Sequence, residues 1–215
     1  RPELYEQSML SLAASDKDVL DVCNGTEDGR FIRWAEGDVS ALVNPHKRQW
    51  YNDAKAKGTL FFTEAYEDIS NHQMVVSAAA PYKGADGAIR GAVCVDISLA
   101  TLDTRVKNLK YHGEGQGIIV EPSGLIIASS EGMAMHRVDE NPVLKENFPA
   151  MLQNKEGYFA TEKDGEEQII AYTTVPSSGW IVAIAVPESV AFAQLTSLKT
   201  TYAVLSLLGI LLVAG

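Results

Sequence analysis

The sequence is poor in cysteine and histidine, the side chains that most often build metal sites and disulfide frameworks. It holds two cysteines and four histidines among 215 residues. Cys23 and Cys94 are too few for a disulfide framework, show no metal-ligand spacing, and each lie in an apolar, strand-like run. We therefore expect free thiols that pack as small buried groups, with a single disulfide between them as the alternative. Neither state would make them catalytic.

Motifs for metal or cofactor binding are also missing. The histidines lie far apart, with no second histidine or glutamate at ligand spacing, so we expect surface side chains at His46, His72, His112 and His136. The glycine-rich segment 113–117 precedes a predicted strand, whereas a phosphate-binding loop joins a strand to a helix. The sequence thus predicts no metal and no cofactor.

Basic residues are scarce. There are 18 Lys and Arg against 28 Asp and Glu, which gives a net charge of −10. This charge repels phosphate backbones and anionic membrane surfaces, and the basic residues are scattered apart from the cluster His46-Lys47-Arg48. Nucleic acid is therefore excluded as an expected partner.

Charge is absent from residues 200–215, which are almost entirely apolar. The run is shorter than the roughly 20 residues that span a bilayer, but it lacks the polar stripe of a core helix. We expect it to begin a truncated transmembrane helix, with a buried core helix as the alternative. Residues 188–199 should form a connecting helix and residues 1–18 the end of an N-terminal helix. No signal peptide opens the chain, so we expect a piece of a larger membrane protein.

An internal repeat organises the rest of the chain. Two-residue turn motifs between β-branched runs predict β-hairpins at Asp28-Gly29, Asp86-Gly87, Ser123-Gly124 and Asp164-Gly165. The strand-like segment 74–81 resembles 169–176, and 91–96 resembles 180–185. Gly124 follows Gly29 by 95 positions, and Pro176 follows Pro81 by the same number. The chain therefore contains two copies of one unit.

Each copy is predicted to fold as β-β-α-β-β with one further strand. The helical segments are residues 45–58 and 141–154, and the further strands are near residues 61–66 and 158–161. A five-stranded antiparallel sheet with helices on one face is an α+β layer architecture. We expect two PAS-like halves in tandem along the N-terminal helix, at residues 19–108 and 109–187.

Four segments resemble a known family. They are Asp28-Gly-Arg and residues 45–54, 62–66 and 91–98. Their Arg-x-Trp-Tyr block and a strand ending in Val-Asp-Ile-Ser are similar to the double Cache domain of bacterial chemoreceptors, sensor histidine kinases and cyclic-di-GMP enzymes. The resemblance covers about residues 19–195. It implies a non-catalytic signal-transduction domain at the bacterial cell membrane, on the periplasmic or extracellular side, and is consistent with a homodimer.

The resemblance also implies a ligand site in the membrane-distal half, residues 19–108. In amino-acid-binding members the matching motif holds the ligand, which assigns ligand binding to Arg48, Trp50, Tyr51, Tyr66 and Asp96. A guanidinium and a carboxylate offer opposite charges to a zwitterion, and the aromatic rings enclose its aliphatic part. The second copy lacks these charges, so we expect no comparable polar ligand site in the proximal half.

Several alternatives stay open. Amino-acid-binding members of the double Cache family also carry a tyrosine five positions before the residue that matches Arg48, where this chain has Val43. An amine held mainly by Asp96, or a carboxylate held mainly by Arg48, therefore remains a candidate. Arg48 and Asp96 could instead form a structural ion pair, with Trp50 and Tyr51 in the core. A secreted, membrane-tethered hydrolase would rest on the loose nucleophile-elbow motif in residues 128–132, and an adhesive module is the third function considered.

Overall fold

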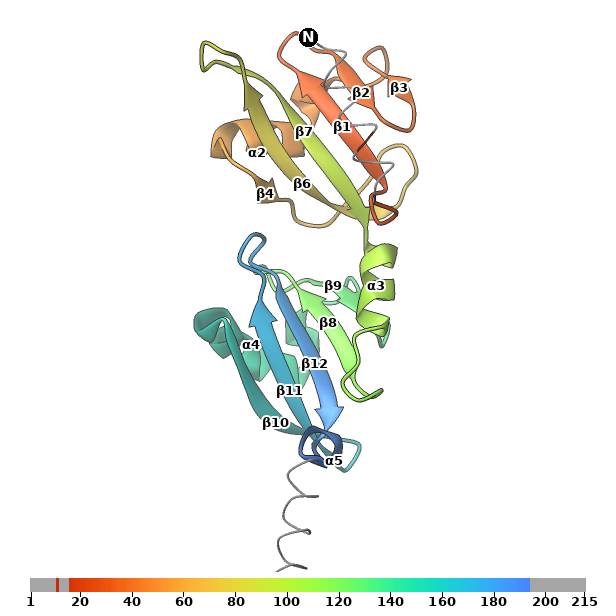
Figure 1. Cartoon of the computed structure of the whole chain (residues 1–215), viewed down its shortest axis with the longest axis vertical. Helices are drawn as coiled ribbons and strands as arrows, with labels where there is room; N and C mark the ends of the chain where they lie inside the picture. The colour runs from red at the N-terminus through yellow and green to blue at the C-terminus, as the bar shows by residue number, and fades with distance from the viewer. Residues whose placement is uncertain (1–10, 12–15, 194–215) are drawn as a thin grey trace, which may run out of the picture.

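A computed structural model describes residue 11 and residues 16–193 of the chain. They form two antiparallel β-sheets that follow one another along the long axis of the molecule (Figure 1). Helix α3 (Leu99–Lys107) connects the two sheets. We call the part with the first sheet the first half and the part with the second sheet the second half.

The first sheet has seven strands in the order β3-β2-β1-β7-β6-β4, and β5 also pairs with β6. The strands are β1 (Asp21–Thr26), β2 (Phe31–Arg33), β3 (Gly37–Asp38), β4 (Phe61–Phe62), β5 (Tyr66–Glu67), β6 (Met74–Lys83) and β7 (Ile89–Ser98). A 3-10 turn, η1 (Pro45–Lys47), leads into helix α2 (Gln49–Lys57). Gly58 ends α2 because its φ of 70° is the left-handed conformation that closes helices.

The second sheet has five strands in the order β10-β11-β12-β8-β9. The strands are β8 (Gln116–Val120), β9 (Ile126–Ser129), β10 (Glu156–Lys163), β11 (Glu166–Thr174) and β12 (Ile181–Pro187). A 3-10 turn, η2 (Val138–Glu140), precedes helix α4 (Pro142–Asn154), and α5 (Glu188–Ala191) follows β12. The Asn141 side chain caps α4 by accepting a hydrogen bond from the Leu144 N–H at 3.1 Å.

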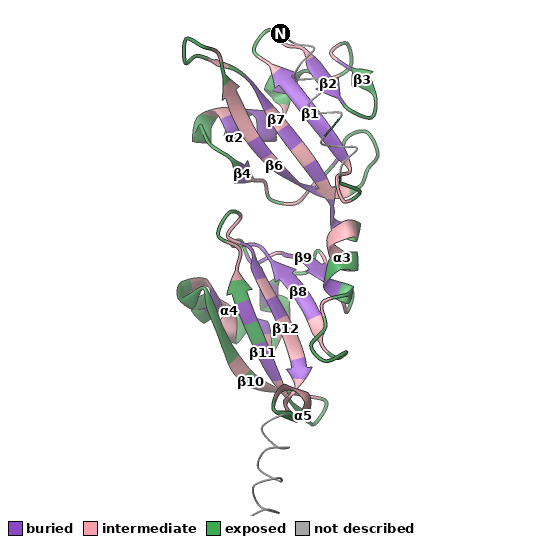
Figure 2. Cartoon of the chain, in the orientation of Figure 1, coloured by how far each residue is buried: buried purple, intermediate pink, exposed green. Residues whose placement is uncertain are grey.

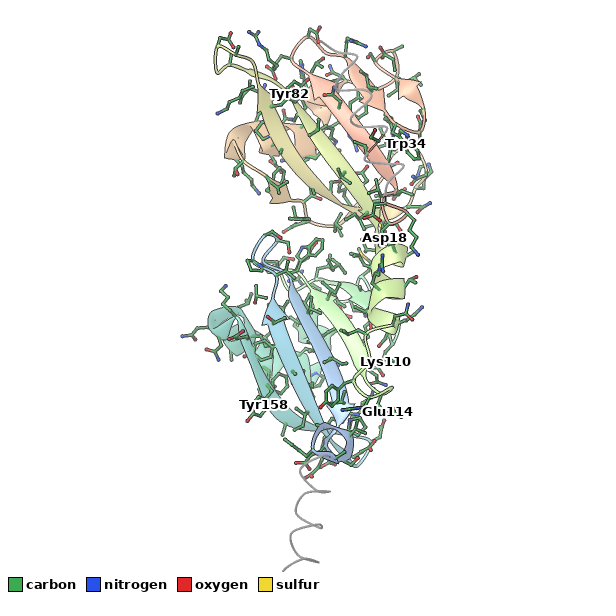
Figure 3. The ribbon with its side chains drawn as sticks, in the orientation of Figure 1. Asp18, Trp34, Tyr82, Lys110, Glu114 and Tyr158 are labelled. Carbon is green, nitrogen blue, oxygen red and sulfur yellow. The ribbon has the colours of Figure 1, made fainter. Side chains whose placement is uncertain are left out.

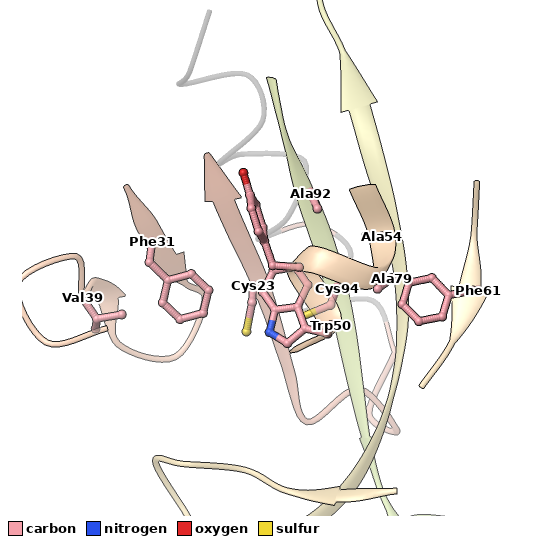
Figure 4. Close-up of a cluster of buried hydrophobic side chains, with 10 residues drawn as sticks. Cys23, Phe31, Val39, Trp50, Ala54, Phe61, Ala79, Ala92 and Cys94 are labelled. Atoms are coloured by element: carbon pink, nitrogen blue, oxygen red, sulfur yellow. The ribbon is translucent and has the colours of Figure 1, made fainter. Parts of the chain in front are cut away.

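Each sheet packs its own helix over one face, and the central strands carry most of the buried residues (Figure 2). In the first half, α2 places Trp50, Tyr51 and Ala54 against Cys23 and Cys94 of the central strands (Figure 4). In the second half, Leu144 and Met151 of α4 pack on the sheet in the same way. The helix that covers the first sheet therefore also fixes the predicted ligand residues of its first turn.

A third apolar cluster joins the two halves. It contains Val76 and Leu99 from the first sheet and α3, together with Ile119, Ile127 and Trp180 from the second half. Beside it, Asp18 forms an ion pair with Arg105 of α3, and Figure 3 shows Asp18 where the two halves meet. The junction is thus packed and not a loose linker.

The predicted α+β architecture with two antiparallel sheets is confirmed. The prediction of five strands was wrong for the first sheet, because β3 is added and the segment predicted at 61–66 forms two separate strands, β4 and β5. Between them the Ala65 N–H donates to Glu121 of the second half at 3.0 Å.

The two copies differ in register at the inner strands. In the first sheet, Cys94 of β7 pairs with Cys23 on one side and with Ala79 on the other. At the matching place of the second sheet, Ala183 of β12 pairs with Ile118 and with Tyr172. The hairpins keep the predicted offset of 95, but β6 and β11 match at an offset of 93. The equivalence of Pro81 and Pro176 was therefore wrong: Pro81 pairs within β6, while Pro176 follows the end of β11.

The predictions for the chain ends fall mostly outside the described residues. This holds for the N-terminal helix apart from residues 11 and 16–18, for the connecting helix beyond residue 193, and for the transmembrane segment at residues 200–215. Among the described residues, every helix is too short or too polar to cross a membrane.

Candidate functional site

A cleft of about 720 Å³ opens beside the start of α2 and the β4–β5 segment of the first half. Arg48 and Trp50 line it from the N-terminal end of α2, and Phe61 and Tyr66 line it from β4 and β5. These elements meet because α2 packs on the sheet whose β6 also pairs with both short strands. Three of the five predicted ligand residues thus face one cleft.

Arg48 supplies a cation to this cleft. Its backbone caps α2 in an extended conformation, and its side chain is half-buried. Within the described part of the chain, the guanidinium has no hydrogen-bond or ion-pair partner. An unpaired guanidinium at the wall of a cleft can take the carboxylate of a ligand in a bidentate contact.

Asp96 lies behind Tyr66, at the floor of the same region. It is only 1% exposed and does not itself line the cleft. The Ser77 hydroxyl donates to Asp96 Oδ1 at 2.5 Å, and the Tyr66 hydroxyl lies 3.5 Å from the same oxygen and 2.7 Å from Ser77 Oγ. Burial raises the pKa of Asp96 to about 6. The Tyr66 hydroxyl therefore links the cleft to a poorly solvated carboxylate.

Tyr51 does not line the cleft. Its side chain is fully buried in the core, and its ring packs edge-on against Trp50 with centroids 5.8 Å apart. Its hydroxyl donates to the carboxylate of Glu27, which also forms an ion pair with Lys55 at 2.7 Å. Burial and the neighbouring Glu27 raise the pKa of Tyr51. Tyr51 supports Trp50 from behind, in contrast to the direct ligand contact expected for it.

The alternative that makes Arg48 and Asp96 a structural ion pair is wrong, because Asp96 is satisfied by Ser77 and Tyr66 and no ion pair joins the two among the described residues. The same alternative is correct in placing Trp50 and Tyr51 in the core. Trp50 belongs to both the core and the cleft wall.

A buried ionic network beside Asp96 was missed by the sequence analysis. Arg33 is 3% exposed; its Nε donates to Asp21 Oδ2 at 2.6 Å and its Nη2 to Asp68 at 3.2 Å. Asp21 is the direct strand partner of Asp96. A charged residue alternating with apolar ones in a strand, as Arg33 follows Phe31 and Asp21 precedes Cys23, is the signal that could have found this network.

The second half holds a smaller cavity of about 190 Å³ between its sheet and α4. Gln116 and Ala185 line it at the places where the first sheet has Asp21 and Asp96. Lys163 at its edge is already paired with Glu131. The charges of the first half thus have uncharged counterparts here, which agrees with the predicted difference between the halves.

The other predicted features take simple structural places. All four histidines are exposed. In the elbow-like segment, Ser129 is buried and its Oγ accepts from the Glu131 N–H at 3.1 Å, while Ser130 Oγ accepts from the Gly117 N–H at 2.9 Å. These contacts close a turn at the end of β9.

Comparison with known proteins places this geometry in context. The chain is 28% identical to the methyl-accepting chemotaxis protein PctB of Pseudomonas aeruginosa over 86% of its length, and 29% identical to TlpA of Bacillus subtilis over 85%. It spans only 29% and 26% of the lengths of these two relatives.

Solved structures are similar over most of the chain. The ligand-binding domain of PctB in complex with L-Gln matches with a TM-score of 0.66 and 26% identity, over 95% of this chain and 84% of that one. The ligand-binding domain of Mlp24 with asparagine matches with a TM-score of 0.55 and 26% identity, over 89% and 84%. The Cache domain family matches residues 6–195, the range that contains both sheets and the cleft. The chain therefore belongs to the Cache domain family, whose members in chemoreceptors are extracytoplasmic sensor domains.

Proposed function

We propose that this chain is the extracytoplasmic ligand-sensing part of a bacterial chemoreceptor and that it binds a free amino acid in the cleft of its first half. The observation that carries the proposal is the position of Tyr66. Its ring lines the cleft that holds the unpaired Arg48, and its hydroxyl lies 3.5 Å from the buried Asp96. Tyr66 thus lies beside both the cleft that contains the Arg48 cation and the Asp96 carboxylate, the two opposite charges that would bind a zwitterion.

The chemistry follows from those groups. Arg48 holds the α-carboxylate through a charge-assisted, bidentate contact. The α-ammonium approaches Asp96 with a small displacement of the Tyr66 hydroxyl, and Trp50 and Phe61 enclose the ligand side chain. Tyr51 keeps the indole of Trp50 in place through their edge-on contact.

The relatives support this choice of ligand. PctB is described as an amino acid chemoreceptor in complex with L-Gln, and Mlp24 was solved with asparagine. By analogy, the second half passes the signal towards a membrane helix that begins in residues 200–215, and the sensing domain itself catalyses no reaction. Membrane attachment and a homodimer are part of the same proposal.

The test is calorimetric titration of the purified chain with a panel of amino acids, guided by a thermal-shift screen. The best amino acid is then compared with its decarboxylated amine and with its deaminated acid. We expect the amino acid to bind at least about tenfold more tightly than either analogue, since each analogue loses one charged contact. Equal affinity for the amine would make the chain an amine sensor, and equal affinity for the acid would make it a carboxylate sensor; either result overturns the proposal.

A further inference from the structure

Two cysteines and an aspartate that are far apart in the sequence converge at the floor of the first half. Cys23 of β1 and Cys94 of β7 are direct partners in the antiparallel ladder, and Asp96 follows Cys94 on the same face. Their three ligand atoms lie within 4.8 Å of one another, and all three residues are buried. Figure 4 shows Cys23 and Cys94 on neighbouring strands beside Trp50.

We propose that Cys23, Cys94 and Asp96 form a binding site for a thiophilic divalent metal ion of the Zn²⁺ class. A tetrahedral zinc ion has Zn–S distances of about 2.3 Å and Zn–O distances of about 2.0 Å, which place a sulfur and an oxygen ligand about 3.5 Å apart. Cys23 Sγ lies 3.9 Å from Asp96 Oδ2, so this pair of ligand atoms needs to approach by only a few tenths of an ångström. Two thiolates with one carboxylate select a soft or borderline ion over Ca²⁺ or Mg²⁺.

Buried acidic groups surround the cluster. Asp21, Asp68 and Asp96 are each at most 3% exposed, and Arg33 is the one buried guanidinium among the described residues. Three carboxylates against one guanidinium leave an excess of negative charge when all are ionised, and a buried charge without a partner is costly. Binding of a divalent ion releases one proton from each thiol, so the net charge of the cluster is −1 both before and after binding. The favourable change is the direct contact between the ion and the buried Asp96 carboxylate.

Arg33 limits the ligand set to three. Asp21 Oδ2 lies 3.8 Å from Cys23 Sγ, but the same oxygen accepts from Arg33 Nε at 2.6 Å. Asp21 is therefore held in its ion pair and is not counted among the ligands. Three protein ligands are a common number for a zinc ion.

The metal site shares Asp96 with the proposed amino-acid site, but the two sites can be tested separately. Cys23 and Cys94 have no part in the proposed amino-acid contacts, so their variants separate the two. A coordinated Asp96 carboxylate is no longer free to accept from an ammonium, and a bound metal should therefore weaken amino-acid binding.

The experiment is titration of the reduced, chelator-treated chain with Co²⁺, followed by absorption spectroscopy and displacement with Zn²⁺. The sequence has only two cysteines, so any thiolate-to-cobalt charge-transfer band reports this pair. We expect one Co²⁺ per chain with near-ultraviolet charge-transfer bands and visible bands of tetrahedral intensity, both removed by Zn²⁺.

Variants assign the ligands. Cys23→Ala and Cys94→Ala should abolish the charge-transfer bands, and Asp96→Asn should weaken metal binding at least about tenfold. The matched control is His136→Ala, which removes an exposed histidine of the second half and should leave the titration unchanged. Circular dichroism checks that each variant is folded.

Three results would overturn the metal site. They are the absence of charge-transfer bands in the folded, reduced chain, Zn²⁺ binding that persists unchanged in Cys94→Ala, and a Cys23–Cys94 disulfide in protein isolated without reductant, shown by its mass and lack of free thiols. Amino-acid titration distinguishes the two proposals. Retained amino-acid binding with lost metal binding in Cys94→Ala supports both, whereas metal binding without any amino-acid affinity in the unaltered chain removes only the proposed function.

Discussion

At the scale of single residues, the first half combines charges that are satisfied within the protein with one that is not. Arg33 is enclosed by Asp21 and Asp68, so its role is explained by the fold itself. Among the described residues, Arg48 faces the cleft without a partner, and Asp96 accepts only from neutral groups, the Ser77 and Tyr66 hydroxyls and the Cys23 thiol. We therefore expect Arg48 and Asp96 to form the charged contacts with the ligand.

Removal of either charge should have a different effect on ligand choice. Asp96→Ala should weaken every ligand that carries an amine, and Arg48→Ala should weaken amino acids while sparing a decarboxylated amine. Loss of one partner from a desolvated charged contact costs about 2 to 5 kcal/mol, or roughly 30-fold to several thousandfold in affinity. Calorimetric titration of each variant with the best amino acid and its amine analogue measures both effects.

Lys145→Ala is the matched control for that pair, because Lys145 is an exposed cation on α4 of the second half and lies outside the cleft lining. Its affinity should equal that of the unaltered chain. If Arg48→Ala and Asp96→Ala both bind like this control, the cleft is not the amino-acid site.

Sequence reasoning could find the residues of this site but not all their roles. Tyr66 and Asp96 come together because β6 pairs with both β5 and β7; the sequence predicted the pairing of β6 with β7, but not that of β5 with β6. The hydroxyl of Tyr51 was misassigned because its partner, Glu27, lies in the turn after β1, and helix spacing carries no information about that contact. Asp21 and Arg33 were missed for the same reason: each has a partner on another segment.

At the scale of elements, α2 sits unusually close to the first sheet because β1 has a glycine beneath it. A Cβ added at Gly25 would lie 2.7 Å from Pro45 Cβ and 2.8 Å from Tyr51 Cδ2. The absence of a side chain at Gly25 thus lets η1 and α2 pack directly on the strand. The position of Arg48 and Trp50 depends on that close approach.

Gly25→Ala should therefore push η1 and α2 away from the sheet. Insertion of one methyl group into such a contact costs about 1 to 3 kcal/mol of unfolding free energy, which urea denaturation measures. Ligand affinity should fall together with stability, because the start of α2 carries two cleft residues. Lys145→Ala, at an exposed position of α4, should change the unfolding free energy by less than about 0.5 kcal/mol. An unchanged urea midpoint for Gly25→Ala would contradict this account of the packing.

The internal repeat predicted the register of the hairpins correctly but not that of the inner strands. The hairpin turns fixed the offset of 95 between the copies, because each uses a glycine with positive φ, 91° at Gly29 and 85° at Gly124. The inner strands kept no such marker, and the connections that follow β6 and β11 differ in length. Similar apolar runs can be aligned at several registers, so Pro81 and Pro176 were matched two positions out of register.

At the scale of the whole molecule, the lower edge of the cleft is also the contact between the halves. Ala65 lines the cleft, and its N–H donates to Glu121 of the second half at 3.0 Å. Next to it, the rings of Phe62 and Trp180 meet with centroids 5.0 Å apart. A ligand that moves the β4–β5 segment would therefore act on the second half directly, through one hydrogen bond and one aromatic contact.

The Glu121 contact should make the stability of the molecule depend on pH. Glu121 is 2% exposed, and burial raises its pKa to about 6, above the ordinary value of 4.5. The folded state binds the Glu121 proton more tightly than the unfolded state does. The contribution of protonated Glu121 to the unfolding free energy is therefore complete below about pH 4.5 and is lost as the pH rises through about 6.

Glu121→Gln keeps an acceptor for the Ala65 N–H and removes the titration. The variant should be more stable than the unaltered chain by about 1 to 2 kcal/mol at pH 7, with no advantage at pH 4. Urea denaturation of both proteins between these pH values measures the difference, and Glu146→Gln, an exposed carboxylate of α4, provides the control. A constant difference between Glu121→Gln and the unaltered chain across this range would mean that Glu121 does not titrate with a raised pKa in the junction.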